Sequence, residues 1–361
     1  MELSILKTGA LGDVLRTTAI LPGLAARHDN LRVTWVTAKG ALDLIQAHPL
    51  IAQVVTCDPS DLVSVAAVGD QLAETRWEHV ISLDDEGPMC ALATRLAEAS
   101  TGSCVDDLGI GGVLSGAYRA ADGSLRYTND VGAWFDMGLL SRFGKAEADR
   151  RKIANLRTHP EIYAEMLGIE KGEPELPLPA SAQDFARDFS ESMELRAHGR
   201  LIGMNTGSGG RWESKKLSVD RSVALMECIS ASEPNGVTFL ILGGPEERDR
   251  NREILRACAR RVRAVDAGTD NGLLEFAALV DQLDLLITSD SLALHVANAR
   301  RVPIVAFFAP TSASEIDLYG RGICVASTSP DYCSYRRDAD TSTLTAERLA
   351  AAVLELLRRS L

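Results

Sequence analysis

Short apolar runs alternate with amphipathic segments along the first 83 residues. Helical spacing covers residues 13–27, 41–47 and 61–76, and Pro22 predicts a kink or an early end in the first of these helices. The apolar runs carry many β-branched residues, which is typical of strands buried on both faces, and they are LSILK (3–7), VTWVT (33–37), IAQVVTC (51–57) and HVISL (79–83). Strands that alternate with helices in this way predict a parallel, doubly wound α/β sheet.

The pattern changes after residue 101. Seven glycines fall between positions 102 and 132, so this stretch is rich in turns. Two interpretations stand side by side: irregular structure or short strands near the ligand face of the domain, or a flexible surface excursion. A basic stretch follows at 143–157, and a helix is predicted at 159–167.

A second α/β pattern begins after GIEKGEPELPLPASAQD, residues 168–184, whose three prolines and several charges make it the predicted linker. The strands predicted beyond it are RLIGMNT (200–206), GVTFLILGG (236–244), RAVDAG (263–268), DLLITSD (284–290) and VPIVAFFAP (302–310), with helices between them. We therefore expect one α/β domain over residues 1–175 and a second over 183–340. A terminal amphipathic helix is predicted at 341–361, with Thr345 as its N-cap.

Composition argues against several classes of protein. The 361 residues are 46% hydrophobic and 24% charged, and no run of 18 apolar residues occurs, so a membrane-spanning helix is not expected. The formal net charge of −12 argues against general nucleic-acid binding, which depends on neutralising phosphates with Lys and Arg. The seven cysteines form no CxxC pair and the N-terminus has no secretory signal, so we expect a cytoplasmic protein with reduced thiols and no metal site.

Residues that can carry chemistry gather at four predicted strand ends, which is where open α/β sheets bind ligands. The first is Gly9-Ala10-Leu11-Gly12-Asp13, which fits neither the dinucleotide fingerprint nor a Walker A loop. Its two glycines allow a tight turn and a close approach of a ligand to the backbone. Asp13 has two interpretations at this point, a helix N-cap or a catalytic carboxylate.

The second strand end is NTGSGGRWESKK, residues 205–216. Small residues with free backbone N–H groups, hydroxyls and nearby cations suit a diphosphate. The alternative is a glycine-rich loop with surface lysines, which the density of hydrogen-bond donors disfavours.

The third strand end, residues 242–247, and the fourth, residues 289–295, are less specific. Pro245 and the acids after it suit the first turn of a helix, and a carboxylate there also suits ribose hydroxyls. In the fourth, Ser291 can cap a helix whose N-terminus is an anion site. His295 lies one turn further on, and the phosphate-type features of the same half favour a place near the ligand over simple packing.

Taken together and in order, these stretches resemble glycosyltransferase family 9, the family of the bacterial ADP-heptose:lipopolysaccharide heptosyltransferases. The resemblance covers nearly the whole chain and rests on ILKTGALGDVLRTTAILPGL, NTGSGGRWESKKL, ILGGPEERD, LITSDSLALHVANARRVPIVAFFAPTSASE and the terminal helix. It implies a GT-B fold of two facing Rossmann-like domains with the site in the cleft. The N-terminal domain would hold the acceptor, the C-terminal domain the nucleotide-sugar, and the last helix would cross back to the N-terminal domain.

The resemblance also implies an inverting, metal-independent transfer of heptose from ADP-heptose to a hydroxyl of a glycan or other acceptor, with no cofactor. The family's general base falls on Asp13, beside Gly12, and its phosphate lysine on Lys215, with Lys216 one position away. The family's other donor-binding positions fall on Thr206, Gly207, Ser208, Gly210, Gly244, Glu247, Asp290, Ser291 and His295. One departure is Leu292, which stands where the family has glycine.

The sequence leaves the acceptor open. Residues 1–178 hold 16 Lys and Arg against 25 Asp and Glu, a poor match for a phosphorylated glycolipid. A local basic cluster can compensate or can be a solvated helix face, and it consists of Arg142, Lys145, Arg150, Arg151, Lys152 and Arg157. A glycolipid acceptor would imply peripheral association with the inner face of the inner membrane. Two rival functions also stand: a GT-B transferase or epimerase using another nucleotide-sugar, and an inactive nucleotide-sugar-binding protein.

Overall fold

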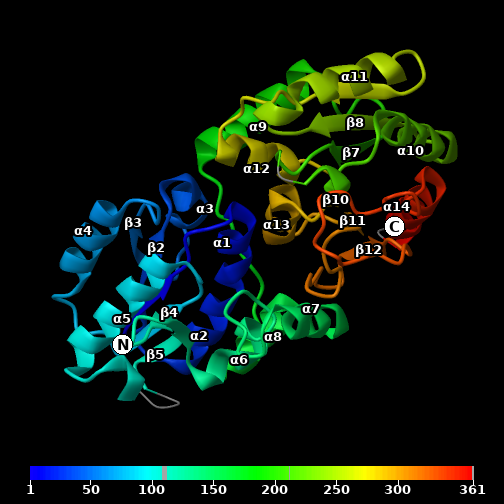
Figure 1. Cartoon of the computed structure of the whole chain (residues 1–361). Helices are drawn as coiled ribbons and strands as arrows, with labels where there is room; N and C mark the ends of the chain where they lie inside the picture. Colours follow the sequence, from blue (N-terminus) through cyan, green and yellow to red (C-terminus); the bar gives the residue numbers. More distant parts are fainter. Residues whose placement is uncertain (108–111, 211, 360–361) are drawn as a thin grey trace. The chain divides into compact units, whose positions relative to one another are not determined.

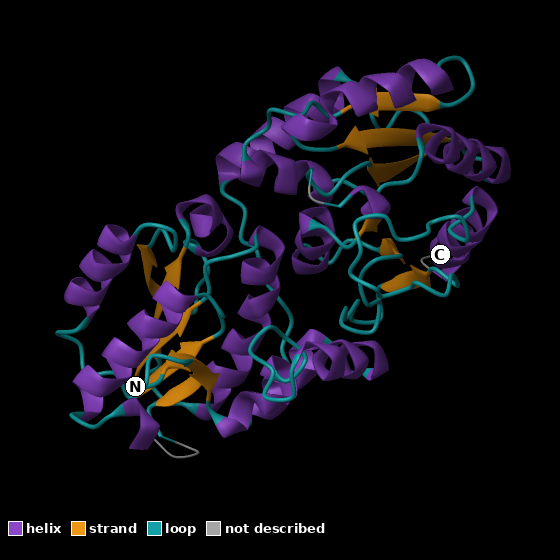
Figure 2. Cartoon of the chain, viewed as in Figure 1, coloured by secondary structure: helices purple, strands orange, loops and turns teal. Residues whose placement is uncertain are grey.

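The computed structural model describes residues 1–107, 112–210 and 212–359 of the chain. The chain divides into two compact units, residues 1–177 and 178–361, and each has its own six-stranded sheet (Figure 1). The division falls inside the segment that the prolines of the sequence indicate as the linker. In both units helices lie on the two sides of the sheet (Figure 2).

The sheet of the first unit has the strand order β3-β2-β1-β4-β5-β6, parallel except for the antiparallel pair β5 and β6. Ile5 and Leu6 point to opposite faces of β1 and are both fully buried, which is why the predicted strands are apolar throughout. The strands are β1 (Glu2–Leu6), β2 (Arg32–Thr37), β3 (Ile51–Thr56), β4 (His79–Ser82), β5 (Leu114–Arg119) and β6 (Leu125–Tyr127).

The helices of the first unit follow the predicted spacing with two differences. Pro22 lies in the first turn of its own helix, where its missing N–H costs nothing, so the predicted helix 13–27 is two α-helices joined by a 3-10 turn. No helix is predicted above for residues 87–101, where α5 forms. The helices, with η for a 3-10 turn, are α1 (Leu11–Thr17), η1 (Thr18–Ile20), α2 (Leu21–Arg27), η2 (Lys39–Ala41), α3 (Leu42–Ile45), α4 (Leu62–Leu72), α5 (Gly87–Thr101), η3 (Val105–Asp107), η4 (Asn129–Val131), α6 (Gly132–Phe135), α7 (Lys145–Ala154) and α8 (His159–Leu167).

The glycine-rich segment 102–132 contains the strands β5 and β6, which supports its interpretation as short strands. Position 116 of this segment has room only for glycine, because a Cβ there would lie 1.9 Å from the carbonyl oxygen of Ser82 in the neighbouring strand. Gly109 and Gly111 of this segment lie outside the described residues.

The sheet of the second unit is parallel throughout, with the order β12-β11-β10-β7-β8-β9. Its strands are β7 (Arg200–Asn205), β8 (Val237–Leu242), β9 (Arg263–Asp266), β10 (Leu285–Ser289), β11 (Ile304–Phe308) and β12 (Gly322–Ala326). Its helices are α9 (Ala180–Ser192), η5 (Glu213–Lys215), α10 (Val219–Ser232), η6 (Pro245–Glu247), α11 (Arg248–Cys258), α12 (Leu273–Asp281), α13 (Leu292–Ala299) and α14 (Ala346–Arg359).

The terminal helix α14 belongs to the second unit, so the expectation that it crosses back to the N-terminal domain is wrong. Its apolar face, with Leu349, Val353 and Leu357, is buried in one cluster with Val223 and Met226 of α10. Thr345 caps it as predicted, because its Oγ1 accepts a hydrogen bond from the backbone N–H of Arg348 at 3.3 Å. Residues 360–361 of the predicted helix lie outside the described part of the chain.

The two sheets have the same topology. When the strands of each unit are counted from one to six along the chain, their order across the sheet is 3-2-1-4-5-6. The chain direction across the sheet reverses between β1 and β4 in the first unit and between β7 and β10 in the second. Ligands bind outside the carboxyl ends of the strands at such a reversal. The fold therefore selects one ligand position in each unit.

Candidate active site

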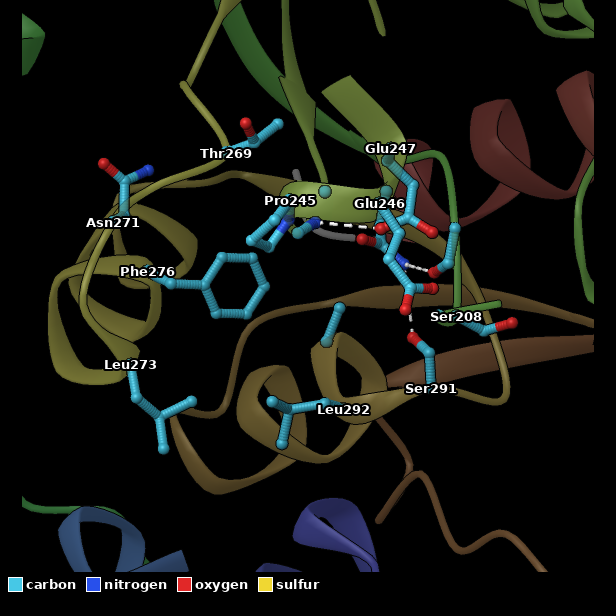
Figure 3. A pocket seen from close by; sticks show the side chains of 16 residues that line it. Ser208, Pro245, Glu246, Glu247, Thr269, Asn271, Leu273, Phe276, Ser291 and Leu292 are labelled. Atoms are coloured by element: carbon cyan, nitrogen blue, oxygen red, sulfur yellow. Dashed lines mark hydrogen bonds between the residues drawn. The ribbon is translucent and has the colours of Figure 1, made fainter. Parts of the chain in front are cut away.

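A cavity of about 570 Å³ lies at the carboxyl ends of β7, β8, β9 and β10 in the second unit. Four loops form it (Figure 3), and they contribute Asn205 with residues 207–209, residues 243–247, Thr269 with Asn271, Leu273 and Phe276, and residues 291–293. Five of the donor-binding residues expected from the sequence line this cavity: Gly207, Ser208, Gly244, Glu247 and Ser291.

Asn205 ties the loop after β7 to the loop after β10. Its side-chain amide donates hydrogen bonds to the Gly207 carbonyl at 2.7 Å, to Thr288 Oγ1 at 3.0 Å and to Ser291 Oγ at 3.2 Å. Gly207 is required here, because a Cβ would lie 2.2 Å from Oε1 of Glu247. The two loops are therefore fixed against each other at the cavity wall.

Among the described residues, two buried polar side-chain atoms at the cavity have no hydrogen-bond partner: Ser208 Oγ and Glu247 Oε1. The other oxygen of Glu247, Oε2, accepts a hydrogen bond from the backbone N–H of Gly244 at 3.0 Å, which fixes the carboxylate. Because buried polar groups are nearly always satisfied, these two atoms are candidates for contact with a polar ligand.

Thr206 is a correction to the predicted ligand set. Its backbone N–H donates to the Leu242 carbonyl at 3.1 Å, and its hydroxyl donates to Asn251 Oδ1 at 2.5 Å. The side chain is buried beneath the loop and is absent from the cavity lining. Thr206 therefore supports the loop, and its hydroxyl is directed to the protein and not to the cavity.

Lys215, Asp290 and His295 form a charged cluster beside the cavity without lining it. Lys215 Nζ donates to the Asp290 carbonyl and to its Oδ2, both at 2.8 Å, and His295 Nε2 lies 3.9 Å from Oδ1 of the same carboxylate. The Asp290 carboxylate thus pairs with Lys215 and lies beside His295, and it is not part of the cavity lining.

Lys216 is paired with carboxylates. Its Nζ lies 3.0 Å from Glu213 Oε1 and 3.9 Å from Glu247 Oε1. The sequence left Lys215 and Lys216 as alternatives one position apart, and the structure directs them to different carboxylates on different strand ends.

The N-terminus of α13 has no side-chain cap. Ser291 is its N-cap residue, but the Ser291 hydroxyl pairs with Asn205 and with Thr288 Oγ1 at 3.0 Å and makes no bond to the helix N–H groups. The first N–H groups of an α-helix have no partner inside the helix and carry its positive dipole end, so they suit an anion at this side of the cavity.

The wall after β9 is the part that sequence reasoning missed. Phe276 and Leu273 of α12 and the preceding Thr269 and Asn271 form it, and the ring of Phe276 extends into the cavity near Pro245 (Figure 3). An aromatic and an aliphatic side chain beside two hydrogen-bonding groups suit a planar heterocycle. The sequence did indicate this wall in one way, because the strand RAVD was predicted and its carboxyl end lies beside those of β7, β8 and β10.

A second cavity, of about 310 Å³, lies in the first unit and is lined by Asp13. Three lysines and three aspartates share this lining with aromatic side chains, and they are Lys7, Lys145, Lys152, Asp13, Asp85, Asp149, Trp134 and Phe135. Two residues of the predicted basic cluster, Lys145 and Lys152, line this cavity, and Lys145 pairs there with Asp149 at 2.5 Å. Arg142, Arg150 and Arg157 pair with Asp136, Glu147 and Glu165.

Asp13 lies in the first turn of α1, whose N-cap is Ala10, so the interpretation of Asp13 as an N-cap is wrong. Its carboxylate is 36% exposed and pairs with Arg16 Nη2 at 3.0 Å, and the Arg16 guanidinium lies 5.8 Å from the ring centre of Trp134. The ion pair with Arg16 thus holds the Asp13 carboxylate at the lining of this cavity.

Asp84, directly after β4, was also missed. It accepts hydrogen bonds from Lys7 Nζ at 2.7 Å and from the backbone N–H and the hydroxyl of Thr8, both at 2.6 Å. These bonds fix the loop between β1 and α1 that leads to Asp13. Burial and the nearby Asp84 raise the pKa of Glu86 above its usual value. The signal in the sequence was the run Asp84-Asp85-Glu86 at the end of HVISL.

Two expected positions remain. Gly12 is buried within α1 in the first unit and lines neither cavity. Gly210 also lies outside the lining, and a Cβ there would be 2.9 Å from Glu246 Oε2. Arg211 of the same loop lies outside the described residues.

Metal-binding clusters and membrane-spanning helices are absent from residues 1–107, 112–210 and 212–359. In these ranges no group of three or more His, Cys, Asp and Glu side chains is placed to hold a metal ion. No helix within them has the length and apolar character needed to cross a bilayer.

Sequence comparisons agree on one family. A protein-family model described as Glycosyltransferase family 9 (heptosyltransferase) matches residues 160–345, more than half of the chain. The chain is also 22% identical over 319 residues to the lipopolysaccharide core heptosyltransferase OpsX of Haemophilus influenzae, with 85% of this chain and 79% of that protein covered.

Solved structures share the fold over the full length. A glycosyl transferase family 9 protein from Veillonella parvula has a TM-score of 0.75 at 18% identity, with 99% of this chain and 97% of that chain covered. The ADP-heptose lps heptosyltransferase II of E. coli has a TM-score of 0.66 at 15% identity, with 100% and 99% covered. The E. coli heptosyltransferase WaaC with ADP has a TM-score of 0.60 at 17% identity, with 99% of each chain covered.

Proposed function

The chain belongs to glycosyltransferase family 9 and is a glycosyltransferase of GT-B fold. From this premise we propose that it transfers a heptose from ADP-heptose to a hydroxyl of a glycan acceptor, with inversion. The observation that carries the donor half of the proposal is the cavity of the second unit. There the open N-terminus of α13, the unsatisfied Ser208 and Glu247 and the apolar wall of Phe276 form one continuous site.

Each part of the nucleotide has a place in this cavity. The diphosphate lies at the N-terminus of α13, where the Ser208 hydroxyl and the glycine loop donate to it and Lys215 neutralises it. The ribose hydroxyls donate to Glu247 Oε1, which has no other hydrogen bond. The base packs on Phe276 and Leu273, within reach of Thr269 and Asn271.

The transfer is a single displacement. The acceptor oxygen bonds to the anomeric carbon from the face opposite the diphosphate, and the carbon–oxygen bond to the diphosphate breaks with its electron pair, releasing ADP. Asp13 accepts the hydroxyl proton, which is worth about 10²–10⁴-fold in rate for general-base catalysis. Lys215 and the loop N–H groups stabilise the charge on the leaving diphosphate, and we propose that they do so without a divalent metal.

The acceptor half of the proposal is the cavity that Asp13 lines. Its three lysines and three aspartates offer donors and acceptors to the polar groups of a glycan, and Trp134 suits a sugar face. The reaction requires the two units to bring the Asp13 carboxylate within hydrogen-bonding distance of the attacking hydroxyl. A crystal structure with ADP and an acceptor analogue tests this requirement directly.

Peripheral binding to the inner face of the inner membrane is part of the same proposal. Four large apolar side chains are exposed around α7, and they are Leu139 at 87%, Phe143 at 50%, Ile153 at 58% and Leu156 at 86%. They are interspersed with basic residues, a combination that suits a lipid surface with anionic headgroups. Co-flotation with anionic vesicles, lost on replacing Phe143 and Leu156 by Ser, is the expected result, and binding that is unchanged in this variant contradicts it.

The central experiment combines Asp13→Asn with a donor screen. We expect the variant to bind ADP like the parent protein and to turn over at least about 100-fold more slowly. Turnover equal to that of the parent removes Asp13 from the mechanism. The parent protein should release ADP from ADP-heptose faster than it releases UDP or GDP from other nucleotide-sugars, and transfer should survive EDTA. Release of UDP or GDP instead favours the rival transferase or epimerase, and binding without turnover favours an inactive binding protein.

A further inference from the structure

Arg250 of α11 connects the two ends of the loop between β7 and α10. Its Nε donates a hydrogen bond to the Thr206 carbonyl at 3.0 Å, and its Nη2 donates to the Leu217 carbonyl. Both hydrogen bonds thus go to backbone oxygens at the two ends of one loop and not to carboxylates. The side chain is half-buried, and burial lowers the pKa of Arg250 from its usual value.

The geometry suits only this residue type. A guanidinium is planar and carries five N–H donors in a fixed fork, so it can bond two separate carbonyls at once. A lysine ammonium on its flexible stem has no such fork. Burying a cation is costly unless its donors are satisfied, and the two carbonyls provide that compensation.

The neighbouring residue reinforces the same end of the loop. Asn251 is fully buried, and its Oδ1 accepts the hydroxyl hydrogen of Thr206. Two consecutive residues of α11 therefore hold Thr206 by its carbonyl and by its side chain. Leu217, at the far end, is itself buried in the core of the second unit.

Between the two carbonyls lie the groups that the proposed function assigns to the donor diphosphate: Gly207, Ser208 and Lys215. We propose that Arg250 is a positioning residue that holds this loop in the shape that binds the diphosphate. Arg250 is not among the residues that line the cavity, so its role is indirect. Its positive charge next to the loop adds to the field that favours an anion there. This inference rests on the proposed donor site, and it predicts that the phosphates and not the nucleoside depend on Arg250.

The test compares Arg250→Met and Arg250→Lys with Arg252→Met in the full chain. Arg252 is the matched control, because it lies on the same helix but pairs at the surface with Asp249 at 3.3 Å. Calorimetry with ADP and with adenosine separates the phosphate contribution from the nucleoside contribution. Hydrogen–deuterium exchange of the ligand-free protein reports on the loop independently of any ligand.

We expect Arg250→Met to raise the Kd for ADP about 10- to 100-fold, because the loop loses a charge-assisted hydrogen bond at each of its ends. The Kd for adenosine should stay within about twofold, and Arg250→Lys should fall between the parent and Arg250→Met. Exchange should rise in peptides from 206–217 and stay unchanged in peptides from the first unit. Arg252→Met should change none of these.

Two results overturn the inference. Equal loss of ADP and adenosine affinity would show a general structural role for Arg250. Unchanged exchange in 206–217 would show that the loop keeps its shape without the guanidinium. If the parent protein binds neither ADP nor adenosine, the proposed donor is wrong, and the exchange result still decides whether Arg250 braces the loop. If Arg250→Met does not fold, Arg250→Lys gives the same comparison.

Discussion

Asp84→Asn is the substitution in the first unit whose effect the structure defines most closely. Asp84 is 2% exposed, and its two carboxylate oxygens accept three hydrogen bonds, one from Lys7 and two from Thr8. Asparagine replaces one acceptor oxygen with an N–H donor. Whichever way the amide turns, at least one donor of Lys7 or Thr8 then meets another donor, and Lys7 loses its counter-charge.

The expected cost is about 3 kcal/mol of unfolding free energy. Removing one partner of a buried ion pair costs about 3–5 kcal/mol, and the low end applies because Lys7 is 12% exposed and regains some hydration. A loss of about 3 kcal/mol is a large share of the 5–15 kcal/mol by which a typical domain is stable. Since the same loop leads to Asp13, kcat should fall as well, while ADP affinity in the second unit stays the same.

Urea unfolding followed by tryptophan fluorescence measures this loss, because the Trp35 indole donates a hydrogen bond to the Lys7 carbonyl at 3.2 Å and reports on the loop. Asp70→Asn is the matched control. It removes a carboxylate that pairs with Arg95 on the surface of the same unit, where such pairs are worth about 0–1 kcal/mol. An Asp84→Asn loss no larger than that of Asp70→Asn would show that Lys7 and Thr8 find other partners, and the reasoning would fail.

Three further predictions address packing and protonation. Gly207→Ala places a methyl group 2.2 Å from Glu247 and should weaken ADP binding, measured by calorimetry, at least about 10-fold. Gly244→Ala places its Cβ 3.5 Å from the same carboxylate and should weaken ADP binding less. Equal effects would contradict the steric argument. Burial lowers the pKa of His79 below 6.5, so its neutral ring stabilises the fold above that pH, and this contribution is lost as the pH falls through the folded-state pKa. His79→Gln should therefore flatten the dependence of the unfolding free energy on pH between pH 7 and 5. An unchanged slope would exclude this contribution. Leu349→Ala should cost about 2–5 kcal/mol in urea unfolding of the second unit, and a loss below about 1 kcal/mol would contradict the burial of α14 there.

The fold was largely predictable because its strands are buried on both faces. A strand such as β1, with Ile5 and Leu6 both inside, has no polar side, so its apolar run identifies it without any tertiary information. The partner of an amphipathic helix is different. The apolar face of α14 predicts that one side of the helix is buried, but it does not predict which unit covers that side. For this reason the expectation that the helix crosses back to the N-terminal domain was wrong.

The site was predictable in position and less so in detail. The rule that ligands bind at strand ends pointed to Asp13, Ser208, Glu247 and Ser291, and each of them lines a cavity. Their pairings depend on residues far away in sequence. Thr206 turned out to serve the fold because Asn251, 45 positions later, takes its hydroxyl, and Lys215 meets Asp290, 75 positions later.

Phe276 shows a second reason for what was missed. An aromatic residue on an amphipathic helix has the same spacing whether it faces a core or a cavity, so periodicity cannot distinguish the two. Only the place of β9 beside β8, and of the loop beyond it, turns that side chain into a wall of the site.

The main hydrophobic cluster of the second unit is assembled wholly from residues between Ile202 and Leu357, including the last helix. This cluster thus draws on no residue of the first unit. Recombination near Pro177 would replace the first unit and leave every residue of the cluster in place. Under the proposed function, such an exchange would give a new acceptor specificity to an unchanged nucleotide-sugar site.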